Sequence, residues 1–429
     1  MEKAVFRRVG ATVFQGVTAS GLRYVICPVK KAPTITCAIA VGKGGFRDEE
    51  TIDGTRIPLG TAHFLEHRLF DMKEGNAAAL LSDLRCNSNA FTTSASTTYY
   101  FTCLKEAEWK KGLDILARMV STFHQTDEAV DRERQIILRE REGDLNSSDY
   151  QLMDELRKAM YFSDVLKEDL IGTPESLETI HVSALKKFFL RHYSIGNMFA
   201  IITGDVDPVE AAAKLEKLKM YNGFTPLDAT KAVIAEDRTK VVKREVEVPS
   251  IDGQTYLGVG IKFPSRESLF NKYGDLLFAL YKVIPPLLFS CYAKPIDQAR
   301  QDGLLIFSKD RDIVQNGEDT FAVAGFETNA PRKLKAVLDK HLANPVAGLS
   351  VFGAEMKAAK LSSLAADVSD IADSESYMGD MVDGFENHIA WPALASRAAT
   401  IGSRDIMTFL RDLSTWPRSY VVLRGEKKA

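Results

Sequence analysis

The chain has 429 residues, of which 45% are hydrophobic and 26% are charged, and its formal net charge is −3. These proportions are typical of a globular protein, and the length exceeds that of one ordinary core, so we expect two or three domains. Positive and negative charges nearly balance, which argues against binding to nucleic acid and against binding to a membrane surface.

The segment from Met1 to Arg8 lacks the apolar core of a secretory signal. We also expect no apolar run that approaches a membrane span, and therefore a cytoplasmic protein. The five cysteines are odd in number and show no C-x-x-C spacing, so we expect reduced, mostly buried thiols rather than metal ligands. They are Cys27, Cys37, Cys86, Cys103 and Cys291.

Two strands are predicted early in the chain, over residues 21–26 and 34–41, and they look like a pair. The glycine-rich segment Gly42 to Gly45 lacks the spacing of a phosphate-binding loop and predicts a turn. Helical and strand patterns then mix without the regular alternation of a doubly wound sheet. This order favours an α+β fold built in layers.

The segment from His63 to His67 reads His-Phe-Leu-Glu-His. On a helix, His63, Glu66 and His67 would share one face. Two imidazoles are typical zinc ligands, and a carboxylate beside them can act as a general base. The order H-x-x-E-H is the inverzincin signature, and Gly60-Thr61 can supply a cap for the helix. The alternative is a structural helix whose histidines form hydrogen bonds on a partly buried face.

A catalytic zinc needs a third protein ligand. Residues 130–140 predict a helix in which Glu133 and Glu140 are seven apart, so both carboxylates project from one stripe. The apolar residues Ile136 and Ile137 lie between them and indicate that this stripe is close to the core. Taken alone, the pattern favours pairing of both acids with the neighbouring arginines over metal ligation.

The metal motif followed by Glu133-x6-Glu140 resembles the pitrilysin or insulinase family of zinc peptidases, which includes mitochondrial processing peptidase. The resemblance covers most of residues 15–210 and is closest to the bacterial, processing-peptidase-like members. Further stretches that agree with the family are Asn89-Ala-Phe-Thr92, Thr98-Tyr-Tyr-Phe101, Gly172-Thr-Pro-Glu-Ser-Leu177, Phe189 to Tyr193, Asn197-Met198 and Thr203-Gly-Asp205.

The resemblance implies that His63, His67 and Glu140 bind one zinc ion per chain. It makes Glu66 the general base and Glu133 a supporting carboxylate of the catalytic site. It also implies two homologous, similarly sized α/β-layered domains, a duplicated pitrilysin-type fold enclosing a cavity. Outer carboxylates of this kind fix the orientation of ligating histidines.

The second half of the chain is similar to a degenerate copy of the first. Residues 188–204 have a counterpart in residues 408–425, and each segment predicts a helix end, a turn and a closing strand. The polar, weakly patterned residues 223–243 predict a linker. We therefore expect a catalytic domain over residues 1–222 and a non-catalytic repeat domain, without an H-x-x-E-H motif, over residues 244–429.

A strand near the metal helix suggests how a peptide is bound. If Asn89, Ala90 and Phe91 lie on an edge strand, an extended substrate can add to it through main-chain hydrogen bonds. The alternative is a buried strand that is paired on both sides. The family resemblance favours substrate binding.

Many family members carry an arginine and a tyrosine, seven residues apart, that help to hold the substrate. The corresponding positions here are Ala299 and Ile306, and Arg300 is one residue out of register. We therefore hypothesise a catalytic subunit that forms a homodimer, or a heterodimer with a non-catalytic family member. The predicted function is a zinc-dependent endopeptidase acting on peptides or small unfolded segments. The alternative is a non-enzymatic assembly or scaffold subunit.

Overall fold

A computed structural model of the chain describes residues 1–45, 50–104, 107–220, 229–231, 235–316, 319–347, 349, 353–389 and 391–425. The chain forms two compact units. Unit one comprises residues 1–139, 169–233 and 366–396, and unit two comprises residues 140–168, 234–365 and 397–429. Helices and strands mix in both units, so the predicted α+β class is confirmed.

Unit one is built on a 7-stranded sheet in the order β1-β2-β3-β11-β4-β10-β9. Its strands are β1 (Glu2–Phe6), β2 (Ala11–Val17), β3 (Arg23–Pro28), β4 (Thr34–Val41), β9 (Cys86–Thr92), β10 (Thr97–Leu104) and β11 (Met198–Gly204). The two predicted early strands exist as β3 and β4, but their predicted pairing is wrong. β11 lies between them, parallel to β3 and antiparallel to β4. A partner from so far along the chain leaves no local signal.

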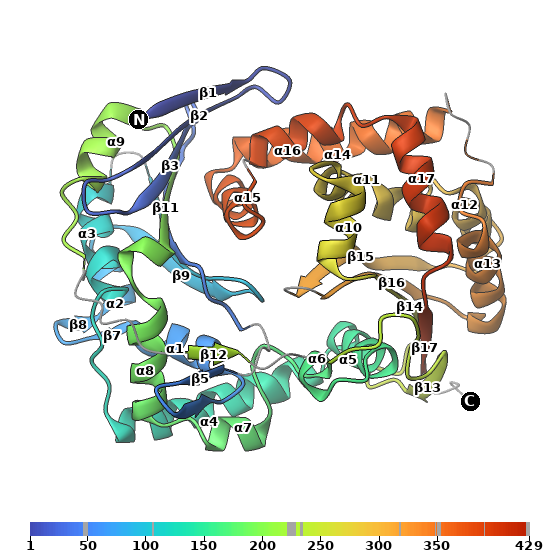
Figure 1. Cartoon of the computed structure of the whole chain (residues 1–429), viewed down its shortest axis with the longest axis horizontal. Helices are drawn as coiled ribbons and strands as arrows, with labels where there is room; N and C mark the ends of the chain where they lie inside the picture. Colours follow the sequence, from blue (N-terminus) through green and yellow to red (C-terminus); the bar gives the residue numbers. More distant parts are fainter. Residues whose placement is uncertain are drawn as a thin grey trace. The chain divides into compact units, whose positions relative to one another are not determined.

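Helices cover both faces of this sheet. The helices α1 (Thr61–Leu69), α2 (Ala77–Asp83), α3 (Trp109–Met119) and α9 (Pro208–Leu215) pack against it, and α8 (Val182–His192) packs on α1. Figure 1 shows α15 (Ser374–Glu386) on the face opposite α3 and α9. Successive side chains of β4 point to opposite faces of the sheet. Ile35 and Cys37 belong to the core under the helices, whereas Thr34 and Thr36 bond to Ser374 of α15.

The first half of the sequence contains further elements. They are β5 (Glu50–Ile52), β6 (Thr55–Ile57), β7 (Asp71–Met72), β8 (Gly75–Asn76), α4 (Asp127–Leu145), α5 (Ser148–Met160), α6 (Asp164–Lys167), α7 (Pro174–Glu178) and a short 3-10 turn at Ile195–Asn197. Of these, α5 and α6 belong to unit two.

Unit two is built on a 5-stranded sheet in the order β13-β17-β14-β16-β15. Its strands are β13 (Glu245–Pro249), β14 (Tyr256–Lys262), β15 (Phe307–Asn316), β16 (Asp319–Glu327) and β17 (Arg418–Arg424). Its later helices are α10 (Arg266–Tyr273), α11 (Leu276–Phe289), α12 (Lys294–Gln301), α13 (Pro331–Ala343) and α17 (Ser403–Ser414). The unit boundary at residue 365 falls within α14 (Ala354–Ala372), and α16 (Trp391–Ala398) lies mainly in unit one.

The second sheet repeats five strands of the first in the same order and with the same directions. β13 and β17 run parallel, as β3 and β11 do, and each following pair is antiparallel in both sheets. The predicted duplication is therefore confirmed. The predicted counterparts are α8 followed by β11 in the first half and α17 followed by β17 in the second.

Each half of the sequence contributes a helix to the unit formed mainly by the other half. α5 packs on β14 and β17 in unit two, and α15 packs on β4 and β11 in unit one. The compact units are therefore discontinuous in sequence. The boundaries at residues 222 and 244 stay a prediction for the sequence repeat. Of the predicted linker, residues 223–228 and 232–234 lie outside the described residues, whereas β12 (Ala229–Lys231) pairs with β5.

One stretch corrects the expectation that no apolar run approaches a membrane span. The helical stretch Leu276–Gln301, which contains α11 and α12, is long and apolar enough to cross a membrane by length and composition. However, 72% of its most apolar window is buried inside the protein. Burial of this kind is typical of a core helix, and α11 packs against β15 and α17.

Candidate metal centre

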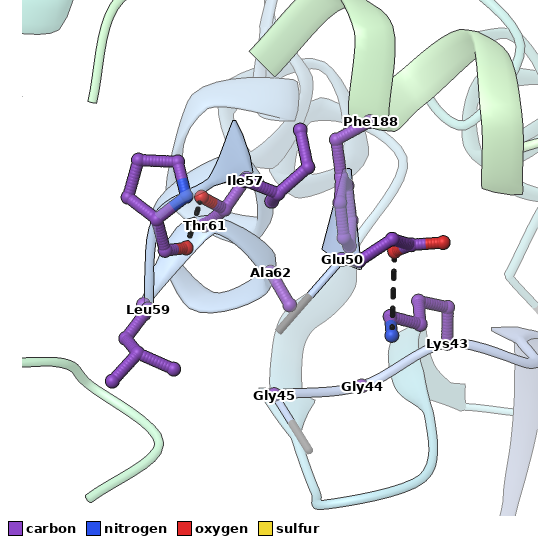
Figure 2. A pocket seen from close by; sticks show the side chains of 11 residues that line it. Lys43, Gly44, Gly45, Glu50, Ile57, Leu59, Thr61, Ala62 and Phe188 are labelled. Carbon is purple, nitrogen blue, oxygen red and sulfur yellow. Dashed lines mark hydrogen bonds and ion pairs between the residues drawn. The ribbon is translucent and has the colours of Figure 1, made fainter. Parts of the chain in front are cut away.

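The helix that carries the histidine motif starts at a position that requires glycine. Gly60 is the N-cap residue of α1 and has a φ of 86°, in the left-handed region. A Cβ atom on Gly60 would lie 2.3 Å from the carbonyl oxygen of Ile171. The cap expected from Gly60-Thr61 is thus Gly60, without a side-chain hydrogen bond, and the hydroxyl of Thr61 donates to the carbonyl of Pro58 at 2.6 Å. Figure 2 shows this end of α1.

Replacing Gly60 by alanine is expected to destabilise unit one by about 2–4 kcal/mol, because backbone strain and overpacking both contribute. Gly54 is a matched control: its φ is 71°, and nothing lies within 4 Å of the position of a Cβ atom. Gly54→Ala should cost only about 1 kcal/mol, the backbone component. Urea unfolding of both variants measures the difference. Equal losses would contradict the close approach to Ile171.

A small cavity lies at the amino-terminal end of α1, lined in part by Lys43, Gly44 and Glu50 (Figure 2). Its volume of about 30 Å³ suits a water molecule rather than a peptide side chain. The Glu50 carboxylate lies 3.5 Å from the Lys43 ammonium and 2.9 Å from Nε2 of His192. Burial lowers the pKa of His192 despite this carboxylate. The cluster anchors the glycine-rich turn on β5 and α8.

Three potential metal ligands converge beside α1. One ligand atom each from His63, His67 and Glu140 lies within 4.8 Å of the others. Both histidines are half-buried, whereas Glu140 is exposed. Unit two begins at Glu140, but α4 runs without interruption from Asp127 to Leu145, so this single helix holds Glu140 near the histidines.

The set fits a catalytic zinc ion. Zinc accepts imidazole nitrogen and carboxylate oxygen at about 2.0–2.2 Å, which places tetrahedral ligands about 3.4 Å apart, and small side-chain rotations reach this from the present spacing. Burial, together with the neighbouring His67, lowers the pKa of His63 to about 4. The imidazole of His63 is therefore neutral at physiological pH, the form that binds metals.

A buried carboxylate supports the second histidine. Glu133 accepts a hydrogen bond from Nδ1 of His67 at 3.0 Å and one from the Arg68 guanidinium at 2.8 Å. Burial acts to raise the pKa of Glu133, but the bonds from His67 and Arg68 outweigh it and hold the pKa below its usual value. With Nδ1 directed at Glu133, Nε2 of His67 is the nitrogen left for a metal.

Arg68 was not singled out from the sequence. Its guanidinium is buried and also bonds to Asp71 at 2.7 Å and to Gln125 at 2.8 Å, and Gln125 donates back to the carbonyl of Arg68 at 2.7 Å. These bonds fix the end of α1 against the segment before α4. The signal for Arg68 in the sequence was its charge, because it directly follows the motif on a helix face expected to be buried.

Replacing Glu133 by glutamine is expected to weaken zinc binding by about 10–100-fold, the usual effect of losing an outer carboxylate. Glu133→Ala should in addition cost about 1–3 kcal/mol of stability, because the buried Arg68 guanidinium loses one of its two carboxylate partners and keeps Asp71. Competition with a chromogenic chelator and thermal unfolding measure the two effects. Unchanged affinity in both variants would show that the bond to His67 does not orient the ligand.

The predicted general base, Glu66, lies on the same helix as the two histidines. Glu66 is 7% exposed, and its Oε2 accepts a hydrogen bond from the hydroxyl of Thr92 at 2.6 Å. Thr92 is the last residue of β9, and it was singled out only as part of a family-like segment. The bond fixes one carboxylate oxygen of Glu66, and it couples the metal helix to the strand expected to bind substrate.

The predicted substrate residues lie on an edge strand. β9 pairs with β10 on one side, and among the described residues no strand pairs with its other side. Asn89 is exposed, whereas Ala90 and Phe91 are half-buried. The alternative of a strand paired on both sides is therefore wrong for the described part of the chain. Main-chain groups of β9 can accept an added strand.

The helix with the two predicted acids follows its expected stripe only in part. Ile137 is fully buried beside Glu133, but Ile136 is 45% exposed.

The two positions where relatives carry substrate-holding side chains lie in unit two. Ala299 is buried in α12, and Ile306 is 49% exposed. Arg300 forms an ion pair with Asp297 at 2.9 Å, a neighbour on its own helix.

Two family models and several relatives of known description match the chain. Residues 24–174 match the family model described as insulinase, peptidase family M16, and residues 179–280 match the model described as the peptidase M16 inactive domain. An uncharacterized zinc protease of Bacillus subtilis is 26% identical over 60% of this chain. A probable mitochondrial-processing peptidase subunit beta of Arabidopsis thaliana is 26% identical over 53% of this chain. These matches span 60% and 42% of the two relatives.

Solved structures share the fold over almost the whole chain. A putative M16-like peptidase from Alicyclobacillus acidocaldarius has a TM-score of 0.84 at 21% identity, covering 96% of this chain and 98% of its own. A protease from Helicobacter pylori has a TM-score of 0.76 at 17% identity, covering 95% and 99%. Matched family models, related zinc proteases and the duplicated fold agree with one another. The chain belongs to peptidase family M16, the insulinase or pitrilysin family.

Proposed function

We propose that the chain is a zinc-dependent endopeptidase that hydrolyses peptides or small unfolded segments. The observation that carries this proposal is the convergence of His63, His67 and Glu140, whose ligand atoms lie within 4.8 Å of one another. Glu66 lies on the same helix as the two histidines, and a general base must lie within hydrogen-bond reach of the water that it activates. Relatives that carry the name zinc protease support the same role.

The chain's own residues have separate roles in the proposed hydrolysis. When bound, zinc supplies Lewis-acid chemistry, polarising a carbonyl and acidifying water. Glu66 takes a proton from the attacking water and passes it to the leaving amine. Thr92 holds one oxygen of Glu66 in place, and Glu133 orients His67. The open edge of β9 would align an extended peptide beside these groups.

A family partner is part of the proposal. Ala299 and Ile306 stand at the two positions where relatives place substrate-holding side chains, and neither can donate a side-chain hydrogen bond. Several relatives are named as the beta subunit of mitochondrial-processing peptidase. We therefore propose a homodimer or a heterodimer with a non-catalytic family member. The cytoplasmic location stays a prediction.

The test is cleavage of a quenched peptide library by the purified chain loaded with one equivalent of zinc. Metal content is measured on the same sample, and the assay is repeated with candidate partner chains. We expect one zinc ion per chain and cleavage that disappears with a chelator and returns with added zinc. Stoichiometric zinc without cleavage under any of these conditions would contradict the peptidase proposal.

The alternative is a non-enzymatic assembly or scaffold subunit of the same fold. The description of the second matched model as an inactive domain, together with Ala299 and Ile306, is consistent with it. The intact set of His63, Glu66, His67 and Glu140 argues against it, because a scaffold has no need of a metal site. Absence of bound zinc after incubation with the metal would favour this alternative.

A further inference from the structure

The last residue of α15 touches the turn that follows the substrate edge strand. Oε1 of Glu386 accepts hydrogen bonds from the hydroxyl of Thr93 at 2.5 Å and from the hydroxyl of Ser96 at 2.6 Å. Thr93 and Ser96 belong to the turn between β9 and β10. Glu386 comes from the second half of the sequence but lies in unit one.

The Thr93 side chain organises the turn from within. Its hydroxyl oxygen accepts from the backbone N–H of Ala95 at 3.1 Å and from that of Ser96 at 3.0 Å. The backbone N–H of Thr93 donates to the carbonyl of Ser96 at 2.9 Å. A hydroxyl has a single proton, and donating it to Glu386 leaves both lone pairs of Thr93 for these amides. The carbonyl of Ser96, 3.3 Å from the same hydroxyl oxygen, is a second acceptor for this proton, and Glu386 is the nearer of the two.

The glycine-rich turn of residues 42–45 also contacts the turn between β9 and β10. The backbone N–H of Gly45 donates to the carbonyl of Thr93 at 2.9 Å. A Cβ atom on Gly44 would lie 2.3 Å from that carbonyl oxygen, so the two turns are in direct contact. The position of Thr93 in turn fixes Thr92, the donor to Glu66.

The Glu386 carboxylate does not stabilise the helix that carries it, because it lies at the carboxyl end of that helix. The carboxyl end of a helix carries partial negative charge and favours basic side chains. Burial also raises the pKa of Glu386. The preceding Phe385 already anchors the helix end, since its ring stacks on Phe199 with centroids 5.0 Å apart and lies 5.2 Å from the Arg23 guanidinium. Within the described part of the chain, the carboxylate bonds to Thr93 and Ser96 of the turn.

We propose that Glu386 is a positioning residue for the metal centre. Its carboxylate holds the turn from Thr93 to Ser96, and through this turn it keeps Thr92 within hydrogen-bond distance of Glu66. The inference rests on the proposed function, in which Glu66 is the base. It also gives the degenerate second half of the chain a direct role in the catalytic unit.

The experiment compares four variants with the wild-type chain. Glu386→Ala removes the acceptor, Glu386→Gln retains an acceptor oxygen, and Ser96→Ala removes one donor. Glu375→Ala is the matched control, because Glu375 lies on the same helix and accepts bonds from Tyr100 at 2.7 Å and from Thr102 at 3.2 Å, away from the turn. Peptide cleavage and amide hydrogen exchange over residues 86–97 are measured for each.

For Glu386→Ala we expect kcat to fall about tenfold, with KM changed less, because the base is misplaced while the edge strand remains. Exchange at the amides of Thr93, Ala95 and Ser96 should rise about fivefold or more. Glu386→Gln keeps an acceptor oxygen with two lone pairs, so this variant and Glu375→Ala should stay within about twofold of wild type in both measurements. Ser96→Ala should lie between Glu386→Ala and wild type.

Unchanged hydrogen exchange in Glu386→Ala would overturn the proposal. Effects of Glu375→Ala as large as those of Glu386→Ala would also overturn it, because they would indicate general detachment of α15. A glutamine variant as poor as the alanine variant would overturn the acceptor role. If Glu386→Ala does not fold, the exchange and kcat of Ser96→Ala decide. If no form of the chain cleaves peptides, the peptidase proposal fails separately, and exchange alone decides whether Glu386 holds the turn.

Discussion

Glu66→Gln is expected to abolish peptide cleavage, lowering kcat by about 10³-fold or more, while zinc binding is retained. Glutamine has the size of glutamate and can still accept the hydrogen bond from Thr92, so the geometry of α1 is preserved. An amide cannot take a proton from water near neutral pH, and loss of general acid–base catalysis typically costs about 10²–10⁴-fold. Metal content and single-turnover cleavage, measured on one preparation, separate binding from chemistry.

The control is Glu74→Gln, which makes the same chemical change at an exposed residue between β7 and β8. Its kcat should equal that of wild type. If Glu66→Gln kept more than about a tenth of wild-type kcat, the assignment of Glu66 as the base would be wrong. Loss of zinc together with activity would instead place Glu66 among the groups that build the metal site.

Glu140→Ala is expected to weaken zinc binding by more than the ~10–100-fold expected for Glu133→Gln, because it removes one of three ligands rather than a group behind a ligand. Glu140 is exposed on α4, so the metal-free variant should unfold within about 0.5 kcal/mol of the wild type. This separation of affinity from stability is the signature of a ligand. Chelator competition and urea unfolding of the metal-free protein measure the two quantities.

Glu142 offers a matched control, since it is an exposed carboxylate on the same helix two residues further on. Glu142→Ala should leave both zinc affinity and stability unchanged. Equal zinc affinity of Glu140→Ala and Glu142→Ala would contradict the ligand set. The metal would then be held by the histidines with some other acid.

The sequence predicted which residues of the candidate site share a helix. His63, Glu66 and His67 lie on one helix, and Glu133 and Glu140 lie on another, because a helical period is set by local backbone geometry. The core side of α4 was less well predicted. A spacing of seven residues places two side chains on one stripe but does not reveal how deep each one lies, and Glu133 is buried whereas Glu140 is exposed.

Contacts between distant segments were not visible. The bonds of Arg68 to Glu133 and of Thr92 to Glu66 join residues on different elements. The predicted pairing of β3 with β4 failed for the same reason, because β11 enters between them from much later in the chain. Hydrogen bonds of a sheet are made between strands, so a strand pattern predicts its existence but not its neighbours.

Local spacing in the sequence was enough to place His63, Glu66 and His67 on one helix face and to predict the repeated pattern of helices and strands, and the family resemblance added Glu140 as the expected third ligand. The tertiary structure decided how these pieces are held. It buried Glu133 against His67, left β9 as an edge strand, and brought α15 from the second half onto the first sheet. Packing of this kind depends on shape and partners across the whole chain, which no local pattern records.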